Sequence, residues 1–265
     1  MRGRLQVVAA STCVAIPVVI ALLGPLFASG DDTKGLASTP GQGGPFGTDF
    51  AGRDVLDQVL LGGRTVVLVA ALATVCTYLV AVPLGMLAGS TGARLLDELL
   101  MRPLDLVLGV PSLLLILLIA SIAPGRIEVL IGVVLLVNLP EVARISRAAT
   151  LALAARPAVD AMRLQGETWW RISVGYLARG MRRTLLADLG TRFTGAIYLV
   201  ASASFLGVGM PPQTSDWAAM VEANRGAMFV QPWAPAIPAA LIVLLVIGIN
   251  LLSERLLRTG KEPVR

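Results

Sequence analysis

The sequence is poor in the residues on which many enzymes depend. It contains no histidine and only two cysteines in 265 residues, so it lacks the usual ligands of a zinc site and the usual general base of a hydrolase. Cys13 and Cys76 each lie in an apolar run, where free cysteine commonly serves as a small hydrophobic side chain. The nucleotide-binding pattern G-x-x-x-x-G-K-[ST] is also absent. We therefore expect no enzymatic activity and no cofactor or metal bound by this chain.

Charged residues are also scarce. They make up 15% of the chain against 55% hydrophobic residues, and the mean hydropathy is +0.77, which exceeds what the core of a soluble domain requires. A helix that crosses a bilayer needs about 20 mainly apolar residues. Six segments meet this length, at 7–27, 66–88, 104–123, 127–148, 185–208 and 234–256. The sequence therefore predicts an all-α integral membrane protein with six transmembrane helices.

Two of these segments leave room for another interpretation. The fourth is interrupted by polar residues and a proline, which are Asn138, Pro140, Glu141, Arg144 and Arg147. We interpret it as a helix with a kink at Pro140, which a helix bundle can accommodate. The first segment follows Arg2 and Arg4, as a secretory signal would, but its apolar run is longer than that of a usual signal peptide.

The basic residues predict the orientation in the membrane. Lysine and arginine beside spans are retained on the cytoplasmic side, and six spans place both termini on one face. That face receives Arg2, Arg4, Arg94, Arg102, Arg144, Arg147, Arg156, Arg163, Arg171, Arg179, Arg182, Arg183, Arg255, Arg258, Lys261 and Arg265. The opposite face receives Lys34, Arg53, Arg64, Arg126 and Arg225. Both termini are therefore expected in the cytoplasm. Because the bases follow the membrane borders and are not interleaved with aromatics, we expect no nucleic acid as partner.

This topology divides the chain into four parts. They are a first transmembrane helix (1–28), an external loop (29–64), a five-helix core (65–257) with a cytoplasmic loop at 149–183, and a cytoplasmic tail (258–265). In the external loop, the stretch Gly35–Gly44 is typical of a flexible connector. Thr48 or Asp49 is a candidate cap for a short interfacial helix carrying Val55, Val59 and Leu60, the alternative being a solvated loop with an ordinary capped turn.

A second external loop, 209–232, carries Trp217 and Met220, and Trp233 follows it. At this depth, aromatic side chains are more typical of anchoring at the membrane interface than of ligand stacking. In the fifth segment, Asp188 and Arg192 are spaced i to i+4, which favours an ion pair over a proton relay.

The cytoplasmic stretch 148–183 combines a helical segment, a turn and aromatic residues. Residues 148–164 have helix-forming composition interrupted only by Pro157, and Gly166 can end this helix. Trp169 and Trp170 follow at once. Exposed apolar anchors on a helical hairpin are what the groove of a protein partner recognises. An amphipathic helix on the inner leaflet is an equally good interpretation of this segment alone.

From Phe46 onward the chain resembles the permease subunits of ABC importers for dipeptides and oligopeptides, specifically the C-type partner of the permease pair. The family pattern F-G-T-D-x-x-G-R-D is matched by Phe46, Gly47, Thr48, Asp49, Gly52, Arg53 and Asp54. The family's cytoplasmic pattern E-A-A-x-x-x-G is matched in part by Asp160, Ala161 and Gly166. Further similarity lies in Ser204–Gly209, Pro211-Pro212, Trp217, Met220, Pro232-Trp233 and Asn250–Leu252.

The chain departs from the family at three places. Met162 replaces the second alanine of the cytoplasmic pattern, Leu177-Ala178-Arg179 replaces I-L-P, and Val200 occupies the position of a frequent glutamate.

The resemblance implies a type I ABC importer permease in the bacterial inner membrane. Its partners would be a second permease subunit, two ATPase subunits or one fused ATPase chain that bind ATP and Mg, an external substrate-binding protein, and membrane lipid. It implies ATPase coupling through Asp160, Ala161, Met162, Arg163, Gly166, Glu167, Trp169 and Trp170. It further implies docking of the binding protein, or a gate, at Asp49, Arg53, Asp54, Trp217 and Met220.

The residues quoted above do not identify the transported substrate. Permeases for haem, nickel chelates and other small solutes share the resemblance. A self-sufficient secondary transporter is a further alternative, but such a protein would be expected to show membrane-embedded charges or an internal repeat, and we find no clear repeat.

Overall fold

The computed structural model describes residues 2–29, 35–41, 43–210 and 214–259, with side chains for residues 7–255 of these ranges. Within this part of the chain the fold is helical and contains no strand. The helices are α1 (Arg2–Phe27), α2 (Val55–Ser90), α3 (Arg94–Leu108), α4 (Ser112–Ile122), α5 (Ile127–Ala154), α6 (Pro157–Leu164), α7 (Ala178–Phe205), α8 (Trp217–Asn224) and α9 (Trp233–Thr259). A π-helical turn (Arg171–Leu177) leads into α7, and a 3₁₀ turn (Arg225–Ala227) follows α8. The tail predicted at 258–265 and the pair Pro211-Pro212 lie almost wholly outside the described residues.

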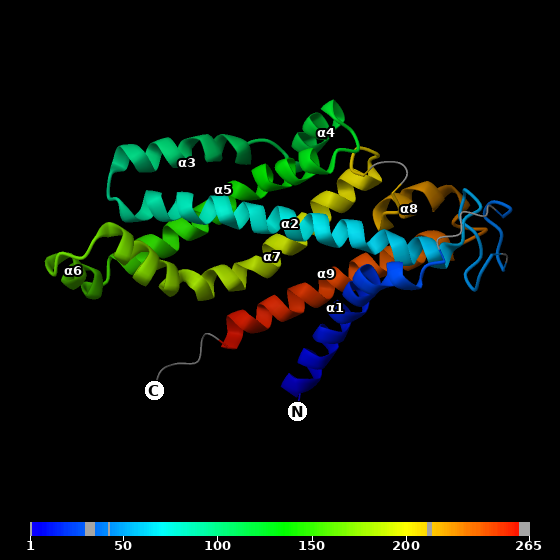
Figure 1. Cartoon of the computed structure of the whole chain (residues 1–265), viewed down its shortest axis with the longest axis horizontal. Coiled ribbons are helices and arrows are strands. Elements are labelled where there is room, and N and C mark those ends of the chain that lie inside the picture. Colours follow the sequence, from blue (N-terminus) through cyan, green and yellow to red (C-terminus); the bar gives the residue numbers. More distant parts are fainter. Residues whose placement is uncertain (1, 30–34, 42, 211–213, 260–265) are drawn as a thin grey trace.

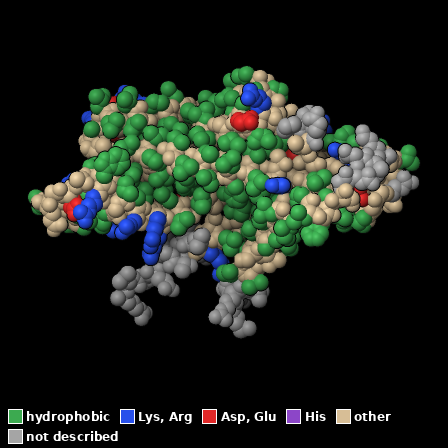
Figure 2. All heavy atoms as spheres, in the orientation of Figure 1, with side chains coloured by type: hydrophobic (Ala, Val, Ile, Leu, Met, Phe, Trp, Pro, Cys, Tyr) green, Lys and Arg blue, Asp and Glu red, His purple; other side chains and the backbone are tan. Residues whose placement is uncertain are grey.

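The long helices run side by side along the molecule, with α6 at one end and the 35–54 loop at the other (Figure 1). The ends of α1 and α9 that carry the chain termini both point away from the 35–54 loop. Figure 2 shows a broad hydrophobic surface over the central helices, with many of the Lys and Arg side chains toward the α6 end and the lower edge. This distribution is that of a bundle whose middle faces lipid.

Helices α2 and α5 form the most extensive helix pair. Two glycines of α2 allow the close approach: a Cβ on Gly85 would lie 2.3 Å from the Ala143 carbonyl oxygen, and a Cβ on Gly89 would lie 2.9 Å from the Arg147 carbonyl oxygen. Small residues at such crossings let helix backbones meet in a membrane, where packing replaces the hydrophobic effect as the driving force. The α2–α5 pair is therefore the scaffold of the core.

Four helices in the described part are long and apolar enough to cross a membrane, namely α1 from Val7, α2, α5 and α9 up to Arg255. A fifth span results if α3 and α4 are counted together. The expected number of six is not confirmed, because α7, although 28 residues long, carries many arginines and Asp188 in its first half. Pro140 lies inside a continuous α5, which extends to Ala154.

The span predicted at 104–123 is not one continuous helix. Helix α3 begins ten residues earlier, at Arg94, and the chain turns by 90° between α3 and α4. Gly109 and Pro111 lie at this break, since proline cannot donate to a continuing helix. Ion pairs from Arg147 to Asp97 and from Arg144 to Asp105, the latter at 2.6 Å, hold α3 against α5.

The external loop differs from expectation in two ways. No separate interfacial helix forms among its described residues, because Asp54 caps α2, which starts at Val55; Asp54 Oδ1 accepts from the amide of Leu56 at 2.6 Å. The described residues at the start of the Gly35–Gly44 stretch are not a free connector, since the amides of Gly35 and Ser38 donate to the carbonyls of Gly52 and Asp49, each at 2.8 Å. Val55 and Val59 are buried in the core rather than lying on the membrane surface. The Asp54 side chain satisfies the first free amides of the helix. Helix α2 can therefore begin at Val55, before the predicted start at 66.

Candidate functional sites

The cytoplasmic segment predicted for coupling is a short helix followed by a tight turn. The stretch 148–164 is divided into two helices at the interruption marked by Pro157: α5 ends at Ala154, and Pro157 begins α6 at a position where a missing amide proton costs nothing. Helix α6 ends in a Schellman motif, with the Glu167 amide donating to the Met162 carbonyl at 3.1 Å and the Gly166 amide to the Arg163 carbonyl at 3.0 Å. Gly166 has φ +78°, which glycine adopts at no steric cost.

One face of α6 packs against its own chain. Val159 is fully buried in a cluster with Leu153, Ile172, Leu177 and Met181, and Met162 packs against that cluster. Met162, which replaces the family's second alanine, is therefore part of the packing interface between α6 and the bundle.

The other face of α6 is open to solvent. Leu164 is 90% exposed, and Asp160 and Arg163 form an exposed i,i+3 pair at 3.7 Å. Ala161 is exposed beside them. A charged pair around an exposed leucine leaves an apolar anchor with a polar rim, which is the composition of a protein-docking surface.

Of the two tryptophans after the turn, Trp169 contacts the helix bundle and Trp170 is exposed at the surface. Trp169 donates from Nε1 to Ser90 Oγ at the end of α2 at 3.2 Å, and it packs edge to face on Trp170 with centroids 4.8 Å apart. Trp170 is 68% exposed. Glu167 pairs with Arg171 at 3.2 Å. The segment after the turn is therefore attached to α2, while the Trp170 side chain stays exposed.

The external candidate residues are mostly buried. Asp49 is fully buried and pairs with Arg53 at 2.9 Å, and it also accepts from the amides of Ala51 and Arg53. Arg53 is half-buried at the loop surface. These contacts, together with the cap formed by Asp54, fix the shape of the loop. In the structure, residues of the motif F-G-T-D-x-x-G-R-D thus stabilise the conformation of the loop.

The expectation that Trp217 anchors at the membrane interface is wrong. Its side chain is fully buried, and its Nε1 donates to the Val59 carbonyl of α2 at 2.8 Å. Met220, one helical turn further, is buried as well. Trp233 is exposed and packs against Phe46 with centroids 6.3 Å apart. Helix α8 therefore locks the external loops onto the start of α2.

The loop and α8 are joined by side-chain amides. Asn224 Oδ1 accepts from the Phe50 amide at 2.9 Å, and Gln231 Nε2 donates to the Phe46 carbonyl at 2.7 Å. Phe229, which follows α8, is 97% exposed. This end of the molecule is a single folded cap with apolar side chains on its outside.

A polar group that the sequence did not reveal lies between α2, α5 and α7. The predicted pair Asp188–Arg192 is confirmed at 3.1 Å, but Tyr78 also donates to Asp188 at 2.8 Å, and Arg192 forms a second ion pair with Glu141. Only the i,i+4 spacing within α7 was visible in the sequence, because the other two partners come from helices far away along the chain.

Comparison with known proteins shows the family. Residues 81–259 match the model described as binding-protein-dependent transport system inner membrane component. The chain belongs to this family of transport permeases. It is thus a multi-pass component of the inner membrane, and the match spans α6 and the turn at Gly166.

Relatives support the same assignment. The chain is 33% identical over 218 residues to the di/tripeptide transport system permease protein DppC of Pseudomonas aeruginosa, covering 82% of this chain and 71% of the relative. It is 27% identical to the oligopeptide transport system permease protein OppC of Bacillus subtilis, covering 94% and 83%. The fold is similar to a chain of the MetNI methionine ABC transporter in an inward-facing conformation, with a TM-score of 0.58, 15% identity and coverage of 75% and 94%.

Proposed function

We propose that this chain is a permease subunit of an ATP-driven importer of dipeptides or oligopeptides. It forms half of the pathway, and a second permease chain forms the other half. Two ATPase subunits, or one fused chain, bind ATP and Mg and supply the energy, while an external binding protein delivers the substrate. The peptide relatives support the substrate class, and the absence of a nucleotide-binding pattern in the sequence supports the need for an ATPase partner.

The observation that carries the proposal is the two-faced coupling segment. Helix α6 offers Asp160, Ala161, Arg163 and Leu164 to the outside and packs Val159 on the bundle. A helix presented in this way fits a groove on a partner protein. The lipid-surface alternative is less well supported, because α6 lies at the far end of the long axis, beyond the helices with the hydrophobic surface (Figure 1 and Figure 2).

The segment is connected so that its movement reaches the core. Beyond the Gly166 turn, Trp169 contacts the end of α2, and the π-helical turn continues directly into α7, which runs to Phe205 near the external side. ATP can shift inward-open and outward-open arrangements only if closure of the ATPases favours one of them. We infer that α6 moves with the ATPases and carries α2 and α7 with it.

At the external end, Asp49, Arg53, Asp54, Trp217 and Met220 act as a gate rather than as a contact surface. Their burial supports this choice, since Trp217 and Met220 have almost no surface to offer a partner. The binding protein would instead contact exposed apolar side chains such as Phe50 and Phe229.

Substitution of Gly166 tests the coupling. In Gly166→Val, a β-branched residue is forced to a positive φ, which costs on the order of 1–3 kcal/mol and disrupts the turn. The matched control is Gly166→Asn, since asparagine tolerates this conformation. No atom lies within 4 Å of a Cβ added at this position, so the added Cβ causes no clash in either variant.

We expect Gly166→Val to insert normally, to assemble with its partners and to lose most ATP-driven peptide uptake, while Gly166→Asn retains it. Membrane content is measured by immunoblotting and uptake with a radiolabelled dipeptide. Wild-type uptake in the valine variant would contradict the coupling role of this turn.

A further inference from the structure

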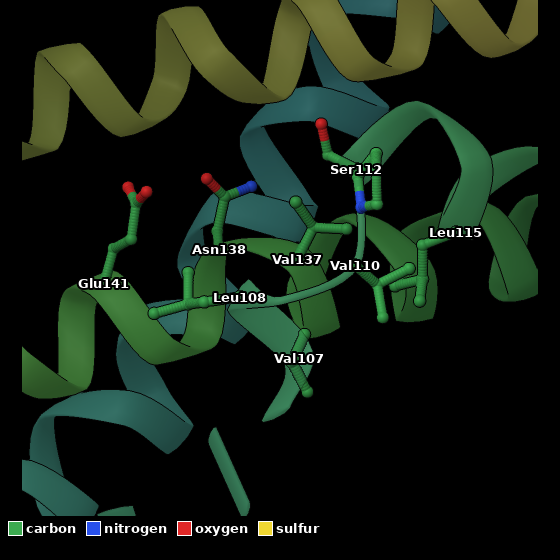
Figure 3. Close-up of a pocket in the computed structure, with 9 residues that line it drawn as sticks. Val107, Leu108, Val110, Ser112, Leu115, Val137, Asn138 and Glu141 are labelled. Atoms are coloured by element: carbon green, nitrogen blue, oxygen red, sulfur yellow. The ribbon is translucent and has the colours of Figure 1, made fainter. Parts of the chain in front are cut away.

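A cavity of about 280 Å³ lies where the chain breaks between α3 and α4, against the middle of α5. Its wall is apolar along Val107, Leu115 and Val137 and polar at Ser112, Asn138 and Glu141. Figure 3 shows the three polar side chains pointing to the same side, toward the ribbon of α7. Cavities with an apolar wall and a few convergent polar groups are the usual form of a small-molecule site.

Glu141 gives this cavity a carboxylate with a free side. Its side chain is 47% exposed although it also pairs with Arg192. Arg192 pairs with Asp188 as well, and Tyr78 adds a donor without adding a charge. Two carboxylates therefore share one guanidinium, and the group carries one negative charge in excess. Such an excess within the apolar length of a bundle is costly unless a cation compensates it.

Asn138 adds an acceptor beside the carboxylate. The residue is 8% exposed, and its Nδ2 donates to the Val134 carbonyl at 2.9 Å. Its Oδ1 has no hydrogen-bond donor among the described residues. Across from it, α7 has Gly195, where an added Cβ would meet only Asn138 Oδ1, at 3.7 Å. Position 195 of α7 thus has no side chain beside the amide oxygen, which is available to a ligand.

The opposite end of the cavity is formed by the first turn of α4. Pro111 precedes this turn and provides no side-chain cap. The first amides of a helix have no partner within the helix and carry partial positive charge. Broken helices in transporters direct such ends at anionic substrate groups. The cavity therefore has an acidic wall on α5 and an electropositive end on α4.

We propose that this cavity is a binding site for the free amino terminus of a peptide during its passage. The ammonium group pairs with Glu141 and donates to Asn138 Oδ1, and the peptide's carboxylate end or a backbone carbonyl faces the first turn of α4. This proposal rests on the proposed function and specifies how this subunit recognises the same substrates.

The test is ATP-driven uptake into proteoliposomes that contain the complete importer with its binding protein. The probe is L-alanyl-L-alanine, and the variant is Glu141→Gln, which keeps a hydrogen-bond acceptor for Arg192 but removes the excess charge. The matched control is Glu128→Gln on the same helix, whose side chain is 80% exposed and outside the cavity. Because all variants use the same binding protein, any difference arises in the permease.

We expect Glu141→Gln to lower the maximal uptake rate about tenfold, as expected for loss of a charge-assisted hydrogen bond, while binding-protein-stimulated ATP hydrolysis continues. Glu141→Asp should restore part of the rate, and Glu128→Gln should remain near wild type. Uptake by Glu141→Gln at the wild-type rate would overturn the site and leave the proposed function intact. Failure of the wild-type importer to take up any peptide would overturn the proposed function and the site together.

A second measurement covers the case in which Glu141→Gln does not assemble. Ser112→Cys is made in a background with Cys13→Ala and Cys76→Ala, and its reaction with a cationic and an anionic methanethiosulfonate reagent is compared. We expect faster reaction with the cationic reagent and at least twofold protection by millimolar L-alanyl-L-alanine. Equal rates with both reagents and no protection would overturn the proposal.

Discussion

Asp216 combines burial with a structural role at the start of α8. Its Oδ1 accepts from the amides of Ala218 and Ala219 at 2.8 and 3.0 Å, and its Oδ2 accepts from Ser204 Oγ at 3.3 Å. The side chain lies in the external cap, outside the membrane-spanning helices. Burial raises the pKa of this carboxyl from 3.8 to about 6, although the hydrogen bonds act in the opposite direction.

This shift predicts a pH-dependent stability. Because the folded-state pKa is above the unfolded one, the folded protein binds the proton more tightly, and the contribution of Asp216 is present below pH 4 and is lost as pH rises through about 6. In Asp216→Asn, the cap is kept and the titration is removed. We expect the stability of wild type relative to this variant to fall by up to about 3 kcal/mol between pH 4 and pH 7.

The measurement is thermal unfolding of both proteins in the same detergent across this pH range. Taking the difference between the two melting temperatures cancels the groups that titrate equally in both. A difference that stays constant with pH would contradict the assignment of a buried, titrating Asp216.

At the scale of elements, the contact of α8 with α2 is the clearest case of fitted packing. The indole of Trp217 lies over Gly62 and Gly63, and a Cβ on Gly63 would be 2.2 Å from Trp217 Cζ2. The tryptophan is therefore accommodated only because α2 lacks side chains at this point.

We expect Gly63→Ala to destabilise the protein by about 1–3 kcal/mol, because the added methyl must displace the buried indole. Gly132→Ala is the matched control, since Gly132 also lies within a helix and has open space around its Cβ. Alanine there should be neutral or stabilise by about 0.5–1 kcal/mol. Thermal unfolding in detergent compares the two variants. Equal melting temperatures for both would show that α8 does not pack on α2 in this way.

Elements defined by local composition could be predicted from the sequence. The long apolar runs indicated α1, α2, α5 and α9 because burial in lipid depends on length and hydropathy alone. The break between α3 and α4 was missed although Gly109 and Pro111 marked it, because the apolar residues continue across it. The early start of α2 depended on a cap at Asp54, a hydrogen-bond feature that hydropathy does not register.

The candidate sites also include features that local sequence predicts and features that depend on distant contacts. The turn at Gly166 followed from local chemistry, and the positive φ confirms a turn there. The burial of Trp217 and the pairing of Glu141 with Arg192 depend on helices that are distant in the sequence, so spacing alone could not reveal them. The coupling and docking roles of the predicted residues stay proposals.

In the whole molecule, three features lie one after another in space along the long axis. The coupling segment is at one end, the cavity beside Glu141 is in the middle, and the cap formed by the 35–54 loop and α8 is at the other end. Helix α2 connects the two ends, through the hydrogen bond of Trp169 with Ser90 at one end and that of Trp217 with Val59 at the other. A change imposed at α6 therefore has a continuous path of packed helices to the external cap.

In the function proposed above, transport by this chain is driven through contact with ATPase partners. The most direct measurement is uptake of a radiolabelled dipeptide into proteoliposomes that contain the permease pair and the binding protein, with and without the ATPase subunits. We expect ATP-dependent accumulation only when the ATPases and Mg are present. Accumulation at the same rate without the ATPases would contradict it.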